Sequence, residues 1–199
     1  MTTPPATTID ALILAAGASS RLGRPKQSVR LRDRTLLQRI VELAQDCVDG
    51  EVHVVVGAQA AVDRAALATT SAQVHEFSDW QRGQGASLAH GLAHAKCGDG
   101  VLVLLVDQYR LQAEHLRALI AQWRRQPQRP AAARYAGTLG VPVVWPRAQI
   151  DELIRHGRPG RERLDARRCT VVDLPRAAFD LDTPEDLASL RRFARQLSG

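Results

Sequence analysis

Hydrophobic and polar residues follow two different periodicities along this chain. Short apolar runs such as ALILAA and VLVLLV lack polar alternation, which is typical of strands that are covered on both faces. Between such runs lie longer segments whose apolar positions recur every three or four residues, as in amphipathic helices. Strands that alternate with helices favour βαβ units, so the pattern predicts an α/β protein with a mostly parallel sheet.

The two periodicities assign residue ranges to the elements. We expect strands at Ala11–Leu14, Val52–Val56, Gln73–Phe77, Val101–Val106, Ala131–Tyr135, Val141–Trp145 and Thr170–Leu174. We expect helices at Leu36–Cys47, Ala60–Ala68, Ala86–Lys96, Gln112–Arg124, Ala148–His156 and Pro184–Leu197. No repeat or linker interrupts this series, so residues 9–199 are predicted to form a single domain of three α/β/α layers, Rossmann-like in its arrangement. The Pro-rich segment 1–8 is predicted to be a flexible arm.

Composition narrows the classes of function. Of the 199 residues, 45% are hydrophobic and 24% are charged, which is typical of a globular domain. No apolar run approaches the length of a membrane span, and the polar N-terminus does not resemble a signal peptide. We therefore expect a cytoplasmic protein with no membrane partner. The three cysteines are odd in number and far apart, which disfavours a disulfide framework.

The formal net charge of +6 points to anionic partners, but the distribution of charge limits which ones. Arginines are spread over the whole chain and only 4% of residues are aromatic, so stacking platforms for nucleic acid are scarce. We expect no nucleic-acid partner. The basic surface is either simply solvated or attracts highly anionic small substrates. Only two of the 27 basic residues are lysines, and one of them, Lys26, lies in the most motif-like segment.

That segment, Leu14–Lys26, reads LAAGASSRLGRPK and directly follows the first predicted strand. Ligands of parallel sheets bind outside the carboxyl ends of the strands, and small residues there let a ligand approach the backbone. Exposed backbone N–H groups together with Arg21 and Lys26 would form a receptor for polyphosphate. The segment has neither the G-x-x-x-x-G-K-[ST] motif of P-loop NTPases nor the G-x-G-x-x-G motif of dinucleotide-binding dehydrogenases.

The same segment resembles the signature of the MobA-like nucleotidyltransferases, which include the molybdenum-cofactor cytidylyltransferases and guanylyltransferases. Three further segments extend the resemblance in the same order as in the family: Asp79–Leu88 (DWQRGQGASL), Tyr135–Val143 (YAGTLGVPV) and Asp180–Leu187 (DLDTPEDL). Together they cover nearly the whole chain. Family members with Leu-Ala-Ala-Gly tend to be cytidylyl enzymes and those with Leu-Ala-Gly-Gly guanylyl enzymes, so Ala16 favours CTP.

Carboxylates complete the predicted site. Asp107 ends an apolar strand, where it should lie at the same sheet edge as Gly17, and Asp180 and Asp182 share one side if their segment is extended. The resemblance implies that Asp107 and Asp182 bind Mg²⁺, with Asp180 as a less certain third ligand. It further implies catalytic roles for Lys26, Asp107 and Asp182. The implied substrate-binding residues are Ala15, Ala16, Gly17, Arg21, Lys26, Gly83 and Ser87, with Arg21 and Lys26 on the triphosphate and Gly83 and Ser87 near the base or ribose.

The resemblance implies transfer of an NMP unit, CMP from CTP, to a phosphate-bearing acceptor with release of pyrophosphate. The leading acceptor is molybdopterin, and a molybdoenzyme or its chaperone would be a partner. Two alternatives stay open: a sugar or polyol phosphate as acceptor, or a diverged nucleotide-binding module without turnover.

Two departures from the family pattern motivate the last alternative. After Asp107 the family usually has Gln or Met and then Pro, whereas this chain has Gln-Tyr-Arg. Loss of the proline is expected to relax this turn, and Arg110 either binds an acceptor phosphate or lies in solvent. In the segment 157–163, Arg158 replaces an acidic residue of the family. A weaker signal is the pair His90 and His94, whose spacing can chelate a metal but for which the sequence shows no third ligand.

Overall fold

The computed structural model describes residues 7–95, 98–156 and 163–197. These residues form a seven-stranded sheet in the order β5-β4-β1-β6-β8-β7-β9. The strands are β1 (Ile9–Ala15), β4 (Val52–Val56), β5 (Gln73–Glu76), β6 (Gly100–Leu105), β7 (Ala131–Tyr135), β8 (Thr138–Pro146) and β9 (Thr170–Asp173). Two short strands, β2 (Arg30–Leu31) and β3 (Arg34–Thr35), pair separately as a hairpin.

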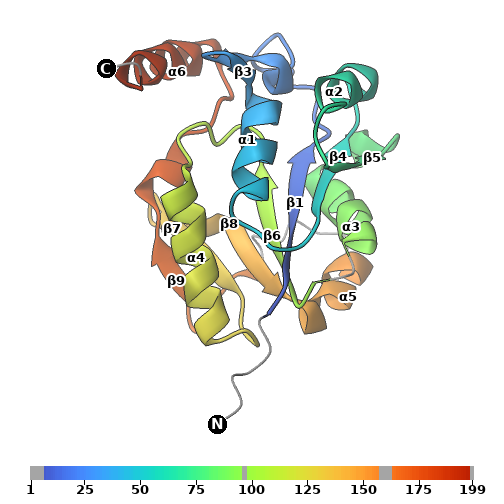
Figure 1. Ribbon diagram of the computed structural model, residues 1–199, viewed down its shortest axis with the longest axis vertical. Coiled ribbons are helices and arrows are strands. Elements are labelled where there is room, and N and C mark those ends of the chain that lie inside the picture. Colours follow the sequence, from blue (N-terminus) through green and yellow to red (C-terminus); the bar gives the residue numbers. More distant parts are fainter. Residues whose placement is uncertain (1–6, 96–97, 157–162, 198–199) are drawn as a thin grey trace.

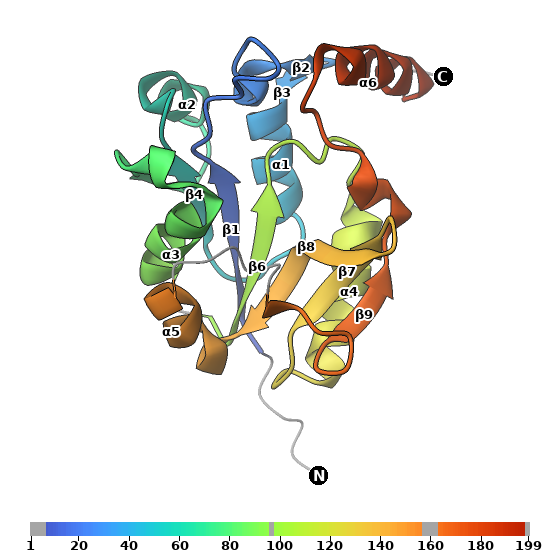
Figure 2. The ribbon, with the colours of Figure 1, turned by 180° about the vertical axis from the view of Figure 1, so that it is seen from behind.

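Six α-helices surround the sheet within the described ranges. They are α1 (Leu36–Gln45), α2 (Ala60–Ala66), α3 (Gln84–His94), α4 (Ala113–Arg125), α5 (Arg147–His156) and α6 (Pro184–Gln196). Helices α1 and α4 cover one face of the sheet (Figure 1), and α3 and α5 cover the opposite face (Figure 2). The three-layer α/β/α arrangement predicted from the sequence is therefore confirmed. Apart from β8, the boundaries of the predicted strands and helices agree with the structure to within two residues.

The burial of the central strands explains why the apolar runs in the sequence predicted the positions of these strands correctly. Side chains alternate between the two faces of a strand, so a strand covered on both sides is apolar at almost every position. The exception in β1 is the buried Asp10, whose carboxylate accepts hydrogen bonds from the N–H groups of Glu51 and Gly98. In β1, Ile9, Ala11 and Ile13 enter the core beneath α1 and α4, whereas Leu12 and Leu14 enter the core beneath α3 and α5. Every residue of β1 is buried as a result.

The half of the sheet formed by β8, β7 and β9 contains a reversal of strand direction that the hydrophobic periodicity does not reveal. Strand β8 runs antiparallel to β6 and to β7, whereas β5, β4, β1 and β6 are parallel. The turn between β7 and β8 uses Ala136 and Gly137 at positive φ, the backbone conformation of a tight hairpin. The hairpin extends β8 to Thr138, so the strand starts three residues before the predicted Val141.

The parallel strands bring their carboxyl ends to one edge of the sheet, and this edge positions the functional site. The segments that follow Ala15, Val56 and Leu105 leave the sheet there. Helix α6 lies above the same edge, near β2 and β3 (Figure 1). At the opposite edge, the N–H of Thr8 donates to Asp99 Oδ2 at 2.8 Å. Within the described ranges, none of the helices combines the length and apolar character needed to traverse a bilayer.

Asp63 is a buried carboxyl in α2 that gives the fold a pH dependence. It is 1% exposed, its Oδ2 has no hydrogen-bond partner among the described residues, and burial raises the pKa of Asp63 to about 7 from an ordinary value of 3.8. The native state therefore keeps a proton that the unfolded chain releases. The contribution of Asp63 to the free energy of unfolding falls as pH rises between these two values.

We predict that Asp63→Asn stabilises the protein more at mildly alkaline than at mildly acidic pH. At 1.36 kcal/mol per pKa unit, the difference in stabilisation between about pH 5 and about pH 8 should be roughly 2 kcal/mol. Urea unfolding of wild type and variant at both pH values measures it. The exposed Asp151→Asn on α5 is the control and should show no such difference. Equal effects of Asp63→Asn at both pH values would contradict the prediction.

Candidate active site

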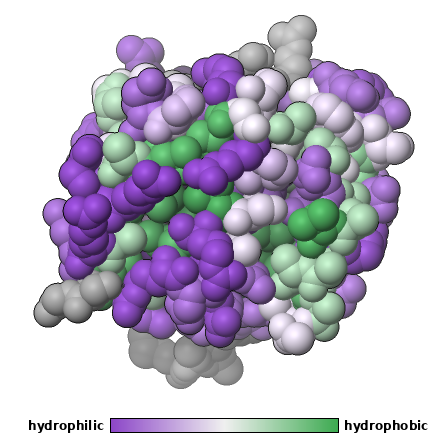
Figure 3. All heavy atoms as spheres, turned by 90° about the horizontal axis from the view of Figure 1, so that it is seen from above, coloured by the Kyte–Doolittle hydropathy of each residue, from purple (hydrophilic) through white to green (hydrophobic). Residues whose placement is uncertain are grey.

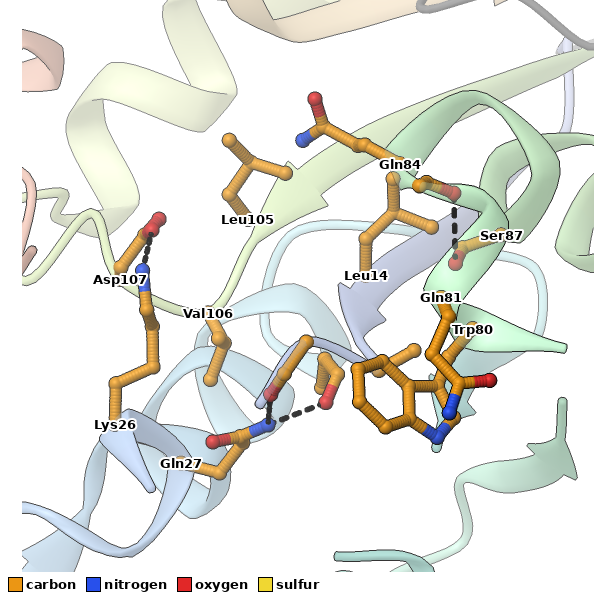
Figure 4. Close-up of a pocket in the computed structure, with 14 residues that line it drawn as sticks. Leu14, Lys26, Gln27, Trp80, Gln81, Gln84, Ser87, Leu105, Val106 and Asp107 are labelled. Atoms are coloured by element: carbon orange, nitrogen blue, oxygen red, sulfur yellow. Dashed lines mark hydrogen bonds and ion pairs between the residues drawn. The ribbon is translucent and has the colours of Figure 1, made fainter. Parts of the chain in front are cut away.

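A cavity of about 320 Å³ opens at the carboxyl edge of the parallel strands. It is lined by Leu14, Ala15, Ala16, Gly17, Lys26, Gln27, Trp80, Gln81, Gly83, Gln84, Ser87, Leu105, Val106 and Asp107. Viewed onto this face, hydrophobic surface lies in a hollow framed by hydrophilic residues (Figure 3). One wall comes from the segment after β1, another from the start of α3, and a third from the end of β6 (Figure 4).

The loop after β1 is held in shape by its own polar groups. Ser19 and Gly23 adopt positive φ, which folds the loop back on itself. The Ser19 hydroxyl then accepts a hydrogen bond from the Lys26 N–H at 3.0 Å. Gln27, which is 1% exposed, donates from Nε2 to the carbonyl oxygens of Ala15 at 2.6 Å and Gly17 at 2.9 Å. Gln27 thus braces the cavity wall, a role that sequence reasoning missed.

Lys26 brings together the two carboxylates that the sequence proposed as metal ligands. Its Nζ lies 2.6 Å from Asp107 Oδ2 and 2.8 Å from Asp182 Oδ1. The Lys26 and Asp107 side chains are only 15% and 14% exposed. Burial by itself lowers the pKa of Lys26, but the charges and hydrogen bonds of Asp107 and Asp182 outweigh it, so this pKa lies above its ordinary value. The exposed Arg21 reaches the other oxygen of Asp182 at 3.1 Å.

Main-chain and side-chain hydrogen bonds fix how the two carboxylates meet. The N–H of Leu181 donates to the carbonyl of Asp107 at 3.2 Å. The buried Gln108 donates from Nε2 to the carbonyls of Val141 at 2.7 Å and Ala177 at 2.9 Å. Gln108 therefore ties the loop after β6 both to β8 and to the segment that leads to Asp182.

The start of α6 holds Asp182 from the other side, as the helix-start pattern indicates. Asp186 Oδ2 accepts hydrogen bonds from the N–H groups of Asp182 at 3.0 Å and Thr183 at 2.8 Å. It also accepts one from the Thr183 hydroxyl at 2.9 Å. These bonds satisfy donors that would be unpaired at the helix end, and they fix the backbone of Asp182.

Tyr109 and Arg110, which depart from the family pattern, anchor the turn after Asp107 rather than relax it. Tyr109 is 2% exposed and its ring packs against Phe193 of α6 at a centroid distance of 5.9 Å. The Arg110 guanidinium carbon lies 3.7 Å from the centroid of Phe179 and 5.3 Å from that of Phe193. Arg110 therefore neither lies free in solvent nor points to a phosphate site. It stacks between two aromatic rings, which stabilises it by a cation–π interaction.

Asp180 lies apart from the ion pairs of Lys26. Burial, and then the negative charges of Asp107 and Asp182, raise the pKa of Asp180 to about 7. Its Oδ1 is buried and has no hydrogen-bond partner among the described residues. Asp180 does not line the cavity around Lys26 but a smaller neighbouring hollow.

Asp107 and Asp182 offer the oxygen donors that a hard divalent cation prefers. Within the described part of the chain, no three His, Cys, Asp or Glu side chains are grouped so as to hold a metal ion by themselves. Two carboxylates at one phosphate-sized cavity are nevertheless the usual protein contribution to a Mg²⁺ site, because substrate phosphates and water complete the shell. Asp107 Oδ1 is buried without a hydrogen-bond partner among the described residues. An oxygen of this kind fits a cation, so the two aspartates fit Mg²⁺.

The wall opposite Lys26 comes from the start of α3. Gly83 precedes this helix at a φ of 94°, and Gly83 and Ser87 both line the cavity, as predicted. Trp80 also lines the cavity. A lone tryptophan in a sequence usually only packs in the core, so this position was not expected from the sequence. Gly57, after β4, supports both walls: a Cβ there would lie 2.7 Å from the Ala16 carbonyl and 2.8 Å from Trp80 Cβ. No motif indicated Gly57, because only the close approach of two segments requires a glycine there.

The predicted site residues therefore converge. All of them line the cavity or, as with Arg21 and Asp182, join it through ion pairs. Their roles stay predictions, and Arg158 lies outside the described residues.

The pair His90 and His94 is part of a larger group of histidines. His75 of β5 stacks on His94 and contacts His53 of β4, with His53 Nδ1 and His75 Nε2 2.9 Å apart. This group lies outside the residues that line the cavity.

Comparison with known proteins identifies the family. Residues 11–171 match the MobA-like NTP transferase domain. The chain belongs to the MobA-like NTP transferase family. It is 38% identical to the protein named nicotine blue oxidoreductase of Paenarthrobacter nicotinovorans, over 95% of this chain and 96% of that protein. It is 27% identical to a probable molybdenum cofactor guanylyltransferase of Nostoc sp., over 92% of this chain and 90% of that protein.

Solved structures of similar chains agree with the fold. Rv0371c of Mycobacterium tuberculosis H37Rv superposes with a TM-score of 0.78 at 34% identity, over 96% of this chain and 98% of that protein. A second structure of Rv0371c, a complex with manganese, superposes with a TM-score of 0.74 at 30% identity, over 92% and 98% of the two chains. A divalent cation is thus found on a relative of the same fold.

We predict that Lys26→Met destabilises the protein in the presence of EDTA, because Asp107 loses its counter-charge while partly buried. The expected loss is about 1–3 kcal/mol, below the value for a fully buried pair because the site is partly open to water. Thermal unfolding should show that Mn²⁺ restores much of the loss. Arg24→Met is the matched control, since Arg24 has no ion pair with another described residue. An unchanged melting temperature for Lys26→Met would contradict the prediction.

Gly17→Ala should separate nucleotide binding from stability. A Cβ at Gly17 meets no atom within 4 Å, so it points into open space rather than into the protein. We expect a melting temperature close to that of wild type, but nucleotide affinity weaker by about tenfold, since a methyl group enters the space where the triphosphate is predicted to bind. Calorimetric titration with CTP measures the affinity. Gly57→Ala is the contrasting variant and should lower stability as well. Unchanged affinity in Gly17→Ala would show that this loop does not contact the nucleotide.

Proposed function

We propose that this protein transfers an NMP unit from a nucleoside triphosphate, preferentially CMP from CTP, to a phosphate-bearing acceptor. The leading acceptor is molybdopterin, in keeping with the named activity of the Nostoc relative. The observation that carries the proposal is the convergence of Lys26, Asp107 and Asp182 beside a cavity walled by Ala15–Gly17. A molybdoenzyme or its chaperone would receive the product.

In this reaction an acceptor phosphate oxygen attacks the α-phosphorus and pyrophosphate leaves. Asp107 and Asp182 would hold Mg²⁺, which supplies charge neutralisation between the attacking and leaving oxygens. Lys26 would then give up its carboxylate partners and donate to phosphate oxygens, where its compact ammonium fits. The exposed Arg21, which pairs with Asp182, would reach the outer phosphates from the rim of the cavity.

The opposite wall would select the nucleoside. Gly83 and Ser87 line the cavity at the start of α3, where the first turn of a helix leaves backbone N–H groups that can bind base or ribose oxygens. The N–H groups of Gly83 and Ser87 themselves donate to the carbonyls of Trp80 and Gly83. Ala16 lines the cavity and is 4% exposed. Family members with alanine at this position tend to be cytidylyl enzymes, which supports CTP as the preferred donor.

A second candidate function is reduction of a flat aromatic compound by a nicotinamide dinucleotide held in the same cavity. The observation that favours it is the 38% identity to the relative named nicotine blue oxidoreductase. The absence of a G-x-G-x-x-G motif after the first strand weighs against it.

Turnover separates the candidates. The protein is incubated with each NTP, Mg²⁺ and either molybdopterin or sugar and polyol phosphates, and pyrophosphate is assayed. In parallel, oxidation of NADH and NADPH is followed with a quinonoid dye. Pyrophosphate release with molybdopterin supports the first proposal, and release only with sugar or polyol phosphates changes the acceptor. Dye reduction without pyrophosphate supports the second candidate, and nucleotide binding without either reaction indicates a non-catalytic module.

We predict that Asp107→Asn and Asp182→Asn each lower the rate of pyrophosphate release at least about a hundredfold, because each removes a charge that holds the cation. Circular dichroism should show an intact fold. Asp151→Asn, on the exposed face of α5, is the control and should keep the wild-type rate. Near-normal turnover in Asp107→Asn would show that the metal assignment is wrong.

A further inference from the structure

A groove of about 500 Å³ lies between α6 and the segment from Arg24 to Arg30. Helix α6 lies beside β2, where this segment ends (Figure 2). The residues that line the groove come from both sides: Arg24, Pro25, Ser28, Val29, Arg30, Leu187, Leu190 and Arg191. None of them lines the cavity at Lys26. The groove is therefore a separate surface feature, and the proposed transfer reaction leaves it without a role.

The floor of the groove is apolar and recessed. Val29 and Leu190 are only 8% and 3% exposed, and Pro25 and Leu187 are half-buried. An apolar surface of this kind favours an occupant that covers it with an apolar group. A small inorganic anion would leave the floor uncovered. A flat lipid surface would not reach it, because the exposed side chains of the rim stand above it.

The rim of the groove is cationic. Arg24, Arg30 and Arg191 are exposed, and no acidic residue is among the described residues that line the groove. Among the described contacts these arginines form no ion pair, and Arg30 donates only to the main-chain carbonyl of Asp33. A guanidinium group suits a carboxylate, which it can bind through two parallel hydrogen bonds. The rim therefore favours an occupant that carries several carboxylates.

We propose that this groove docks a short acidic segment of a partner protein, in which carboxylates flank an aliphatic side chain such as leucine. The aliphatic side chain would cover Val29 and Leu190, and the carboxylates would pair with the arginines of the rim. Such a segment matches both parts of the groove, whereas a simple anion matches only the rim and an uncharged apolar ligand only the floor. The inference does not depend on nucleotidyl transfer.

The position of the groove gives docking a direct path to the active site. Pro25 precedes Lys26 in the loop, and Leu187 lies on α6, whose start fixes Asp182. A docked segment would therefore contact both parts of the chain that meet in the ion pair of Lys26 with Asp182. It would leave the cavity itself open to small ligands, because the two share no lining residue.

Fluorescence anisotropy of the full chain with three labelled hexapeptides tests the proposal without any turnover. The probe is Glu-Leu-Glu-Glu-Leu-Glu. One comparison peptide has glutamine in place of every glutamate, and the other has serine in place of both leucines. We expect a dissociation constant below about 1 mM for the probe and binding at least about tenfold weaker for each comparison peptide. No saturable binding of the probe up to about 1 mM would overturn the proposal, as would equal binding of the serine peptide.

Charge-reversal variants locate the bound probe. Arg191→Glu should weaken its binding at least about tenfold, because a carboxylate then faces the carboxylates of the peptide. Arg192→Glu makes the same charge change on the same helix outside the groove lining, and should weaken binding less than about threefold. Equal losses in both variants would indicate unspecific attraction to a basic surface and would overturn the proposal. A larger loss in Arg21→Glu than in Arg191→Glu would place the peptide at the cavity, with the same consequence.

Two other occupants of the groove are tested in parallel. Self-association that Arg191→Glu abolishes, measured by sedimentation velocity, would assign the groove to a second copy of this chain. Tighter binding to phosphatidylglycerol vesicles than to the probe would assign it to a membrane surface. Either result would overturn the proposal, whereas a monomer that prefers the probe supports it. Absent pyrophosphate release would leave this inference intact, and absent peptide binding would leave the proposed function intact.

Discussion

The site depends on one cation holding two anions that come from distant parts of the chain. Lys26 contacts Asp107 and Asp182, which lie 81 and 156 residues away. Without an opposite charge, two carboxylates at one partly buried edge would repel each other. Every other local feature supports this contact: the loop braced by Gln27, the turn tied by Gln108 and the helix start fixed by Asp186. The sheet matters to function because it brings these three supports to the same edge.

Several elements were predictable because one physical requirement decides them. Strands β1 and β6 are covered on both faces, so their residues are apolar except for Asp10 of β1. The start of α6 was predictable because its capping residues are local in sequence. The reversal of β8 was not, since a buried strand has the same pattern in either direction. Gln27 and Gln108 were also missed, because a glutamine that binds backbone carbonyls across the fold has no characteristic spacing. Tyr109 and Arg110 were misjudged because Phe179 and Phe193 contact them only in the folded chain.

The relatives of this chain have different named activities, one an oxidoreductase and one a guanylyltransferase. A shared fold does not imply a shared reaction, since activity resides in the site. In this chain the loop from Ala15 to Lys26 follows the family pattern, whereas the turn after Asp107 departs from it. The smaller hollow beside the cavity is lined by residues of β1, α3, β6, β7 and β8 and by Asp180.

In the proposed function, the pairing of Lys26 with both aspartates would also govern the order in which ligands can arrive. A bare divalent ion would have to displace the ammonium and leave it beside a like charge, and a bare triphosphate would meet two carboxylates. Each ligand alone is opposed, whereas the metal–nucleotide complex gives every charged group a new partner at once. The two ligands should therefore show strong positive coupling. Free divalent ions would leave the empty site largely unoccupied, and the protein would respond to the complexed nucleotide rather than to either component.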